Sequence, residues 1–265
     1  MWPASGRAQH NGVVNEIPEY DDAGRVVLVT GGARRIGAAI VRSLHDDGWR
    51  VIIHYRHSTE PAQALTDDLN RKRADSAACC AADLHSVAAI DALAAAAHAR
   101  WKRLDALVNN ASSYFSTPLA ELDEAQFNEL FATNLKAPLF LTRACLPLFG
   151  TDAAVVNILD ALARHAQPGF AVYNSAKAAL WAVTETLAVE MAPKVRVNAV
   201  APGHILWAES AELDAQQQQD KLDRVPLRRL GTPEEIAASV RFLLSPQASF
   251  LNGVILPVDG GRRLR

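Results

Sequence analysis

The chain has 265 residues, of which 49% are hydrophobic and 21% charged, and its formal net charge at pH 7 is −2. This length suits one large domain or two small ones, and the charge balance gives no electrostatic case for nucleic acid or an acidic membrane. No apolar run reaches the roughly 18 residues of a membrane span. With three cysteines lacking metal-ligand spacing and no secretion signal, we expect no metal and a cytoplasmic protein.

The first strand signal is the β-branched run 25–29, which breaks into the glycine-containing turn 30–37 and then into helical spacing of apolar residues. Residues 1–23 lack apolar periodicity, and we expect them to be a flexible extension of a domain covering 24–265. A strand, a glycine turn and a helix in this order are typical of a phosphate-binding unit. The glycines let the backbone approach a pyrophosphate, and the helix N-terminus offers N–H donors.

The second strand, 50–53, ends where an NAD-binding unit usually carries an acidic residue. Here the sequence continues as His54-Tyr55-Arg56-His57-Ser58. Arg56 can pair with a 2′-phosphate and Ser58 can donate to it, whereas a carboxylate would repel it. The pattern therefore favours NADPH over NADH, with a solvated loop as the alternative interpretation.

The middle of the chain alternates alanine-rich helices, expected at 60–73 and 86–101, with further strands. A strand at 77–82 ends in Asp83-Leu84, where an adenine edge would lie, and its adjacent Cys79 and Cys80 are expected to be buried free thiols. After the strand near 104–109, the turn 109–113 offers amides and hydroxyls. The helix 124–149 carries Asn134, which would be either a satisfied core group or the holder of a water molecule near the catalytic helix.

A proton-transfer site is predicted around the strand 155–159 and the helix that follows it. Asp160 comes directly after the strand. Tyr173 and Lys177 stand four residues apart in an alanine-rich helical run, so that their side chains share one face. A neighbouring cation would lower the pKa of the phenol towards the working range. The alternative is a surface tyrosine with an unrelated lysine.

The last third contains a strand at 195–200, the pair Pro202-Gly203, a polar stretch at 204–229, a helix from Pro233 and a strand at 253–258. The polar stretch is long for a structureless loop, so we expect a mobile lid with some helix. Seven strand signals alternating with helices predict an α/β fold: a single Rossmann-type doubly wound domain with a seven-stranded parallel sheet and a substrate lid.

With these residues in view, the chain resembles the short-chain dehydrogenase/reductases over nearly all its length beyond the N-terminal extension. The motifs that match in order and spacing are Thr30-Gly31, Gly37, Asn109-Asn110-Ala111, Asn134, Tyr173 with Lys177, and Pro202-Gly203. Two positions depart from the general pattern, because Arg35 replaces a glycine and Asp160 replaces the serine found thirteen residues before the tyrosine. Both departures resemble the pteridine reductases, and the ending 259–265 is similar to dihydromonapterin reductases.

An ionised aspartate in the place of the serine also argues physically against ketone reduction, because it would repel a developing oxyanion. It is better suited to accept hydrogen bonds from ring N–H or amino groups, or to relay a proton. The resemblance implies NADPH-dependent reduction of a pterin ring C=N bond by a homotetramer. A carbonyl or 3-oxoacyl reductase is the first alternative, and a non-catalytic NADP(H)-binding regulator the second. Dihydrobiopterin, dihydromonapterin, dihydrofolate and quinone-type substrates stay open.

The resemblance also implies roles for individual residues. The catalytic group would be Asp160, Tyr173, Lys177 and Asn134, with Lys177 holding the nicotinamide ribose and Tyr173 delivering a proton. Cofactor-binding residues would be Gly31, Arg35, Ile36, Tyr55, Arg56, His57, Ser58, Asp83, Leu84, Asn110, Ala111, Ser112, Tyr173, Lys177, Pro202 and Gly203. Substrate would contact Arg35, Ser112, Tyr114, Asp160, Tyr173, Leu206 and Trp207, with the ring of Tyr114 stacked on the pterin.

Overall fold

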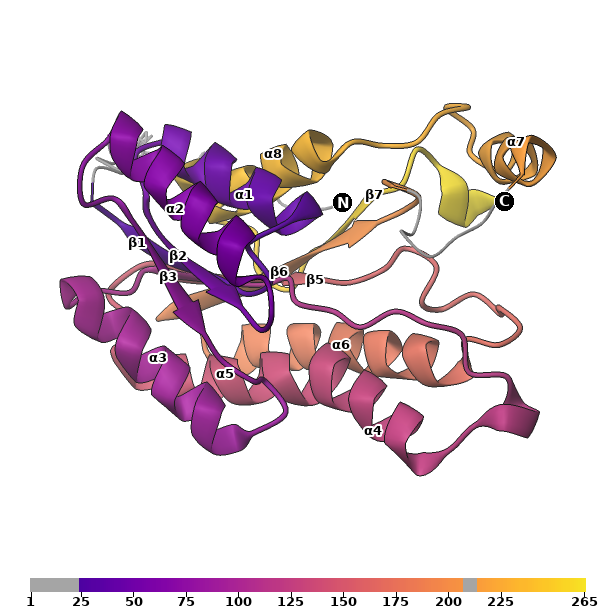
Figure 1. The fold of residues 1–265 in the computed structure, drawn as a ribbon, viewed down its shortest axis with the longest axis horizontal. Coiled ribbons are helices and arrows are strands. Elements are labelled where there is room, and N and C mark those ends of the chain that lie inside the picture. Colours follow the sequence, from indigo (N-terminus) through magenta and orange to yellow (C-terminus); the bar gives the residue numbers. More distant parts are fainter. Residues whose placement is uncertain (1–23, 207–213) are drawn as a thin grey trace, which may run out of the picture.

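The computed structural model describes residues 24–206 and 214–265, and these form one parallel sheet covered by helices on both faces (Figure 1). The order of the strands across the sheet is β3-β2-β1-β4-β5-β6-β7. In chain order they are β1 (Val26–Val29), β2 (Arg50–Tyr55), β3 (Ala77–Ala81), β4 (Ala106–Asn109), β5 (Ala153–Ile158), β6 (Val195–Pro202) and β7 (Ile255–Val258). The predicted seven-stranded Rossmann-type fold is confirmed.

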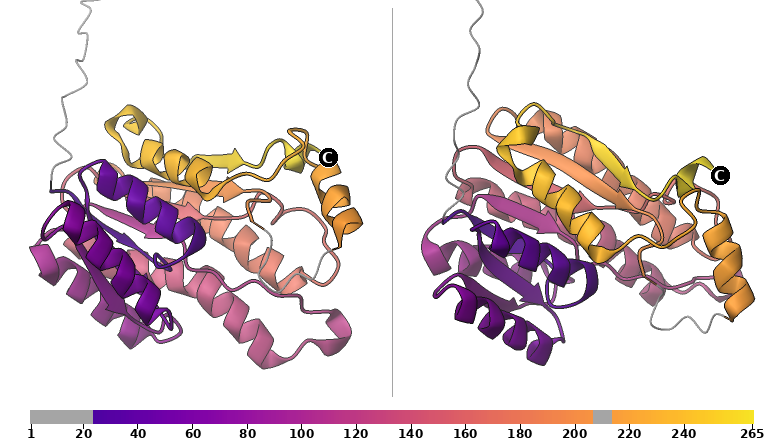
Figure 2. Two further views of the ribbon diagram at one scale, coloured as in Figure 1. Left: turned by 45° about the horizontal axis from the view of Figure 1, so that its top comes forward. Right: turned by 90° about the horizontal axis from the view of Figure 1, so that it is seen from above.

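The helices form two layers, with α1, α2 and α8 on one face of the sheet and α3, α4, α5 and α6 on the other (Figures 1 and 2). Their bounds are α1 (Arg35–Asp46), α2 (Thr59–Lys72), α3 (Val87–Trp101), α4 (Glu124–Phe131), α5 (Ala137–Cys145), α6 (Ala171–Glu190), α7 (Ala215–Asp223) and α8 (Pro233–Leu244). Short 3₁₀ turns are η1 (Leu119–Glu121), η3 (Leu146–Leu148), η4 (Pro246–Ala248) and η5 (Arg262–Leu264), and η2 (Ala132–Lys136) is a π-helix.

The sheet is apolar because both of its faces are covered, which is why its central strands are nearly continuous hydrophobic runs. All four residues of β1 are fully buried, and one large core lies on each side of the sheet. The first core contains α1 and α8, and the second contains α3 and α5. The site is positioned by the central pairing of β1 with β4, in which Val27 lies opposite Ala106 and Val29 opposite Val108. Their carboxyl ends therefore emerge side by side.

Two sequence-based expectations change in detail, and a third is met. The single helix expected at 124–149 is a run of α4, η2 and α5, interrupted by the π-helix. Cys79 and Cys80 are free but only half-buried, because β3 is the edge strand of the sheet, whereas Cys145 is buried. The polar stretch after β6 does contain a helix, α7. Among the described residues, no helix combines the length and apolar character needed to cross a bilayer.

Candidate active site

The site begins at the carboxyl end of β1, where the chain turns through Gly31 into α1. Gly31 has a φ of +61°, a left-handed conformation that glycine adopts without steric cost. A side chain at Gly37 would collide with the Gly31 carbonyl and with the Asn110 side chain. Arg35, at the position where the general motif has a glycine, also has a positive φ of 51°. The arginine thus keeps the glycine turn and adds a guanidinium group, at a cost in backbone strain.

Asn110, just beyond β4, fastens this turn. Its side-chain Nδ2 donates to the carbonyls of Thr30 at 2.8 Å and of Gly31 at 3.1 Å, and its backbone N–H donates to Thr30 Oγ1 at 2.9 Å. The N–H of Ala111 donates to the same hydroxyl at 3.0 Å. The turn is therefore held in shape by hydrogen bonds from the neighbouring strand before any ligand arrives.

His54 fastens the turn from the other side, a role that the sequence pattern did not indicate. The Gly31 N–H donates to its Nδ1 at 3.2 Å, so its proton is on Nε2, which lies 3.1 Å from the Ala82 carbonyl. Burial lowers the pKa of His54 to about 4, although the hydrogen bond to Ala82 opposes the shift. The imidazole is neutral at pH 7. Nothing in the sequence separates it from His57, which is exposed.

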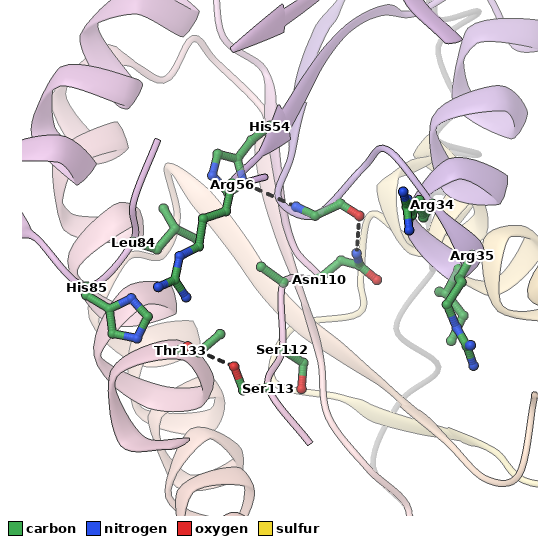
Figure 3. A pocket seen from close by; sticks show the side chains of 14 residues that line it. Arg34, Arg35, His54, Arg56, Leu84, His85, Asn110, Ser112, Ser113 and Thr133 are labelled. Carbon is green, nitrogen blue, oxygen red and sulfur yellow. Dashed lines mark hydrogen bonds between the residues drawn. The ribbon is translucent and has the colours of Figure 1, made fainter. Parts of the chain in front are cut away.

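A groove of about 370 Å³ runs from the glycine turn to the π-helix η2 (Figure 3). Eight residues predicted to bind a cofactor line it: Gly31, Arg35, Ile36, Arg56, Leu84, Asn110, Ala111 and Ser112. Four others, Tyr55, His57, Ser58 and Asp83, neighbour these in sequence but are not among the lining residues. The groove is also lined by six residues that were not predicted to bind a cofactor: Arg34, Gly37, His54, His85, Ser113 and Thr133.

Arg56 reaches the groove as predicted, but ionisable groups that the sequence order did not reveal surround its guanidinium group. Its Nε lies 3.6 Å from Asp83 Oδ1, and one of its terminal nitrogens lies 3.6 Å from Glu129 Oε1. His85 connects the two acids, with Nδ1 2.7 Å from Asp83 Oδ1 and Nε2 2.7 Å from Glu129 Oε2. Hydrogen bonds from His85 lower the pKa of the Asp83 carboxyl. Two carboxylates therefore neutralise part of the charge of Arg56.

The predicted proton-transfer group is assembled where β5 ends and α6 begins. Asp160 lies two residues beyond β5, and Tyr173 is in the first turn of α6. The phenol of Tyr173 donates to Asp160 Oδ2 at 3.1 Å, while Asp160 Oδ1 accepts from the Leu162 N–H at 2.7 Å. The carboxylate is thus oriented by one backbone amide and one side-chain hydroxyl.

Lys177 lies on the same face of α6, buried, and its Nζ donates to the Ile158 carbonyl at 2.8 Å. Burial lowers the pKa of Lys177 to about 8, while Asp160 opposes the shift. The pKa of Tyr173 is raised well above its ordinary value, by burial first and then by Asp160, with Ser112 opposing. The prediction that Lys177 lowers the pKa of the Tyr173 phenol is therefore wrong. The ammonium group of Lys177 is directed at a carbonyl, and the phenol is directed at a carboxylate.

Asn134 is 0% exposed and lies in the π-helix η2, in which the Ala137 N–H donates to the Ala132 carbonyl five residues earlier. Its side-chain amide donates to the carbonyls of Ser113 at 2.9 Å and Leu130 at 3.0 Å, and its Oδ1 accepts from Ser112 Oγ at 2.6 Å. Of the two interpretations of Asn134, the geometry matches a satisfied buried group. It fixes the turn that follows β4.

A cleft of about 570 Å³ opens beside the Tyr173–Asp160 pair. Its lining includes the predicted residues Arg35, Ser112, Tyr114, Asp160, Tyr173, Lys177, Pro202, Gly203 and Leu206. Tyr114 is 52% exposed, and its ring stacks on Phe170 with centroids 5.0 Å apart and meets Tyr173 edge-on at 4.8 Å. Phe170, which also lines the cleft, was not predicted, since a phenylalanine before a helix carries no signal of its own.

Some residues of the stretch expected to form a lid line this cleft. Leu206 lines it, and α7 contributes Lys221, whereas Trp207 lies outside the described residues. His204 also lines the cleft and was not predicted as a site residue. Burial, Arg262 and Lys221 lower the pKa of His204, while Asp160 opposes them. Within the described residues, no cluster of side chains suitable for a metal ion is present.

A glycine turn beside a buried tyrosine and lysine, at the carboxyl ends of parallel strands, is typical of a dinucleotide-binding oxidoreductase. The chain belongs to the short-chain dehydrogenase/reductase family: the family model described as enoyl-(acyl carrier protein) reductase matches residues 31–263.

The chain is similar to several curated proteins over most of their length. Pteridine reductase 1 of Leishmania tarentolae is 34% identical, over 90% of this chain and 96% of that protein. An uncharacterized oxidoreductase of Mycobacterium tuberculosis is 38% identical, over 89% and 91% respectively. The 3-oxoacyl-acyl-carrier-protein reductase of Staphylococcus aureus is 31% identical, over 88% and 96%. These relatives support an oxidoreductase with a relation to the pteridine reductases.

Proposed function

We propose that this protein is an NADPH-dependent reductase that converts a dihydropterin to a tetrahydropterin, with dihydrofolate as a further candidate substrate. The observation that carries the proposal is the Asp160 carboxylate, which occupies the position of the family's catalytic serine and accepts the hydrogen bond of Tyr173. Arg35 supports it, since its side chain lines both the groove and the cleft.

The chemistry of the residues fits reduction of a ring C=N bond better than reduction of a ketone. An ionised Asp160 would repel the oxyanion that develops at a ketone, but it can accept hydrogen bonds from ring N–H and amino groups. Tyr173 is protonated at neutral pH, and its hydrogen bond to Asp160 gives the pair a path along which a proton can pass to a ring nitrogen. Tyr114 offers an exposed aromatic surface on which a planar ring can stack.

The groove fits a nicotinamide dinucleotide. Its glycine turn packs closely against Asn110 and Ala111, α1 begins at Arg35 with its N-terminus at the groove, and Arg34 and Arg56 supply positive charge for phosphates. When bound, the nicotinamide would supply the hydride. Lys177 would hold the nicotinamide ribose, and Arg56 would contact the 2′-phosphate that separates NADPH from NADH.

The test is Asp160→Ser, which restores the ordinary family constellation. We expect kcat/KM for a dihydropterin to fall about 10²- to 10⁴-fold, the usual loss when a positioned acid–base group is removed. NADPH binding, followed by fluorescence, should change little, because Arg35, Arg56 and Lys177 remain. Pterin activity within a few-fold of wild type would make Asp160 a bystander and would favour a carbonyl reductase.

Reduction of a 3-oxoacyl thioester is the second candidate, favoured by the similarity to the staphylococcal 3-oxoacyl reductase. Asp160 counts against this candidate. A serine at this position could donate a hydrogen bond to the ketone oxygen, whereas a carboxylate cannot. An acetoacetyl thioester assayed beside a panel of pterins decides between the two. Thioester turnover that exceeds pterin turnover in the wild type would overturn the pterin assignment.

We also propose a homotetramer. Support comes from a third hollow along α4, η2 and α5, whose lining includes Phe131, Leu135, Leu139 and Phe140. Phe127 beside it is 42% exposed and stacks on Phe131 with ring centroids 4.3 Å apart. Light scattering on the purified protein measures the assembly directly, and a monomer would contradict the proposal.

A further inference from the structure

The side chain of Glu129 joins three segments at the outer end of the groove. Glu129 lies on α4, and its carboxylate accepts from Ser113 Oγ at 2.6 Å in the turn after β4. It lies 2.7 Å from His85 Nε2, beyond the end of β3, and 3.6 Å from a terminal nitrogen of Arg56, beyond the end of β2. Figure 3 shows Arg56, His85 and Ser113 at the same side of the groove.

Both acids around Arg56 are ionised at neutral pH. Burial works to raise the pKa of Glu129, but the Ser113 hydrogen bond, His85 and Arg56 outweigh it, so the pKa is lowered. Hydrogen bonds from His85 lower the pKa of Asp83. The cluster thus places two carboxylates beside one guanidinium group, with the His85 ring between the two acids.

The two carboxylates act differently on the two coenzymes. A phosphate monoester at neutral pH carries about −1.5 to −2 charges, so a 2′-phosphate that approaches Arg56 also approaches both carboxylates. The 2′-hydroxyl of NADH carries no charge and is not affected in this way. The side chains of Arg56 and Glu129 are only partly exposed, at 42% and 32%, so solvent screens their interaction incompletely.

From this arrangement we propose that Glu129 is a specificity-determining residue that limits the preference for NADPH over NADH set by Arg56. The inference rests on the proposed use of a nicotinamide coenzyme. Glu129 opposes the 2′-phosphate in two ways, because it competes for the guanidinium group and repels the phosphate. Removing its charge should therefore strengthen NADPH binding selectively, whereas a purely structural residue would affect both coenzymes alike.

The test compares Glu129→Gln with Glu124→Gln, an exposed glutamate on the same helix. Glutamine keeps the size of the side chain and can still accept from Ser113 Oγ. Dissociation constants for NADPH and NADH are measured by fluorescence at low ionic strength, with thermal unfolding to establish that each variant is folded. We expect Glu129→Gln to bind NADPH about three- to fivefold more tightly, the size expected of one partly exposed charge pair. Its NADH constant, and both constants of Glu124→Gln, should stay within about twofold of wild type.

Three results would overturn the inference. Equal changes for both coenzymes would make Glu129 structural. Selectively weaker NADPH binding would mean that the carboxylate holds Arg56 in place for the phosphate. A wild type that binds neither coenzyme would overturn the proposed function itself, and that result is distinguishable because it appears before any substitution is made.

Discussion

Arg35 is a bulky residue in a backbone conformation that glycine normally adopts. Arg35 has a φ of 51°, and a side chain in the left-handed region costs roughly 1–2 kcal/mol. Its side chain lines both the groove and the cleft, so the strained residue lies where cofactor and substrate would meet. Such strain is found mainly where the side chain is needed for function.

Two substitutions distinguish the effect of backbone strain at Arg35 from the effect of its side chain. Arg35→Ala and Arg35→Gly both remove the guanidinium group, but only glycine relieves the strain. We expect the glycine variant to be more stable than the alanine variant by about 1 kcal/mol in urea unfolding. Both should lose coenzyme affinity to a similar degree. Equal stability of the two variants would show that the turn stores no strain at this residue.

Arg56 permits a test of coenzyme selection that does not depend on Glu129. Arg56→Ala should raise the KM for NADPH about tenfold and leave the KM for NADH nearly unchanged. A tenfold change is at the low end of the effect expected for a charge-assisted hydrogen bond, because two carboxylates already share the guanidinium group. Steady-state kinetics with both coenzymes measure the effect. If the two KM values rise together, the loop after β2 does not select the coenzyme.

At the scale of the element, the π-helix η2 explains how a polar residue is tolerated in the core. The wider turn presents Asn134 to the turn after β4, where all three of its hydrogen bonds with Ser112, Ser113 and Leu130 are made within the protein. π-helical turns are rare and frequently occur at functional sites. Here the π-helical turn connects the helix layer of α4 and α5 to the turn after β4, which borders both the groove and the cleft.

Asn134→Asp changes the hydrogen-bonding character of this residue at constant shape. The carboxylate can still accept from Ser112, but it loses both donated hydrogen bonds and faces the carbonyls of Ser113 and Leu130. We expect a loss of about 3 kcal/mol in the free energy of unfolding, together with weaker coenzyme binding. The exposed Asn128→Asp on α4 is the control and should change stability by less than about 0.5 kcal/mol. A stable Asn134→Asp protein would exclude the anchoring role.

At the scale of the whole molecule, His54 makes the fold sensitive to acid. Its pKa is about 4 in the folded chain, against 6.5 in the unfolded chain. Between these values the unfolded chain binds a proton that the folded chain does not, so stability falls as pH is lowered from 6.5 towards 4. The loss reaches ~3 kcal/mol. Burial shifts the pKa of His45 in the same direction.

Urea unfolding between pH 4.5 and 7.5 measures this dependence. His54→Gln should flatten it over that range, whereas the exposed His57→Gln should leave it as in wild type. An unchanged slope in His54→Gln would assign the acid sensitivity to other groups.

The sequence predicted the parts of the molecule that depend on local pattern and on position along strands. Gly31, Asn110 and Asp160 follow strand ends, which brings them to the same edge of the sheet, and Tyr173 joins them from the first turn of α6. The sequence could not predict the partners of Arg56, because Glu129 lies on α4, far from Arg56 along the chain. The direction of the Tyr173 pKa shift was also out of reach, since it depends on burial and on which group accepts the phenol proton.

The hydrogen bonds from Asn110 to the glycine turn determine when this turn can form while the chain is being synthesised. Asn110 is synthesised 80 residues after Thr30, whose carbonyl it binds. At typical translation rates these residues take roughly 4 to 16 s to add. During that interval the nascent chain can pair β1 with β2, but the turn lacks the amide that fixes it. A ribosome-bound chain that ends before residue 110 should therefore be unable to retain the dinucleotide.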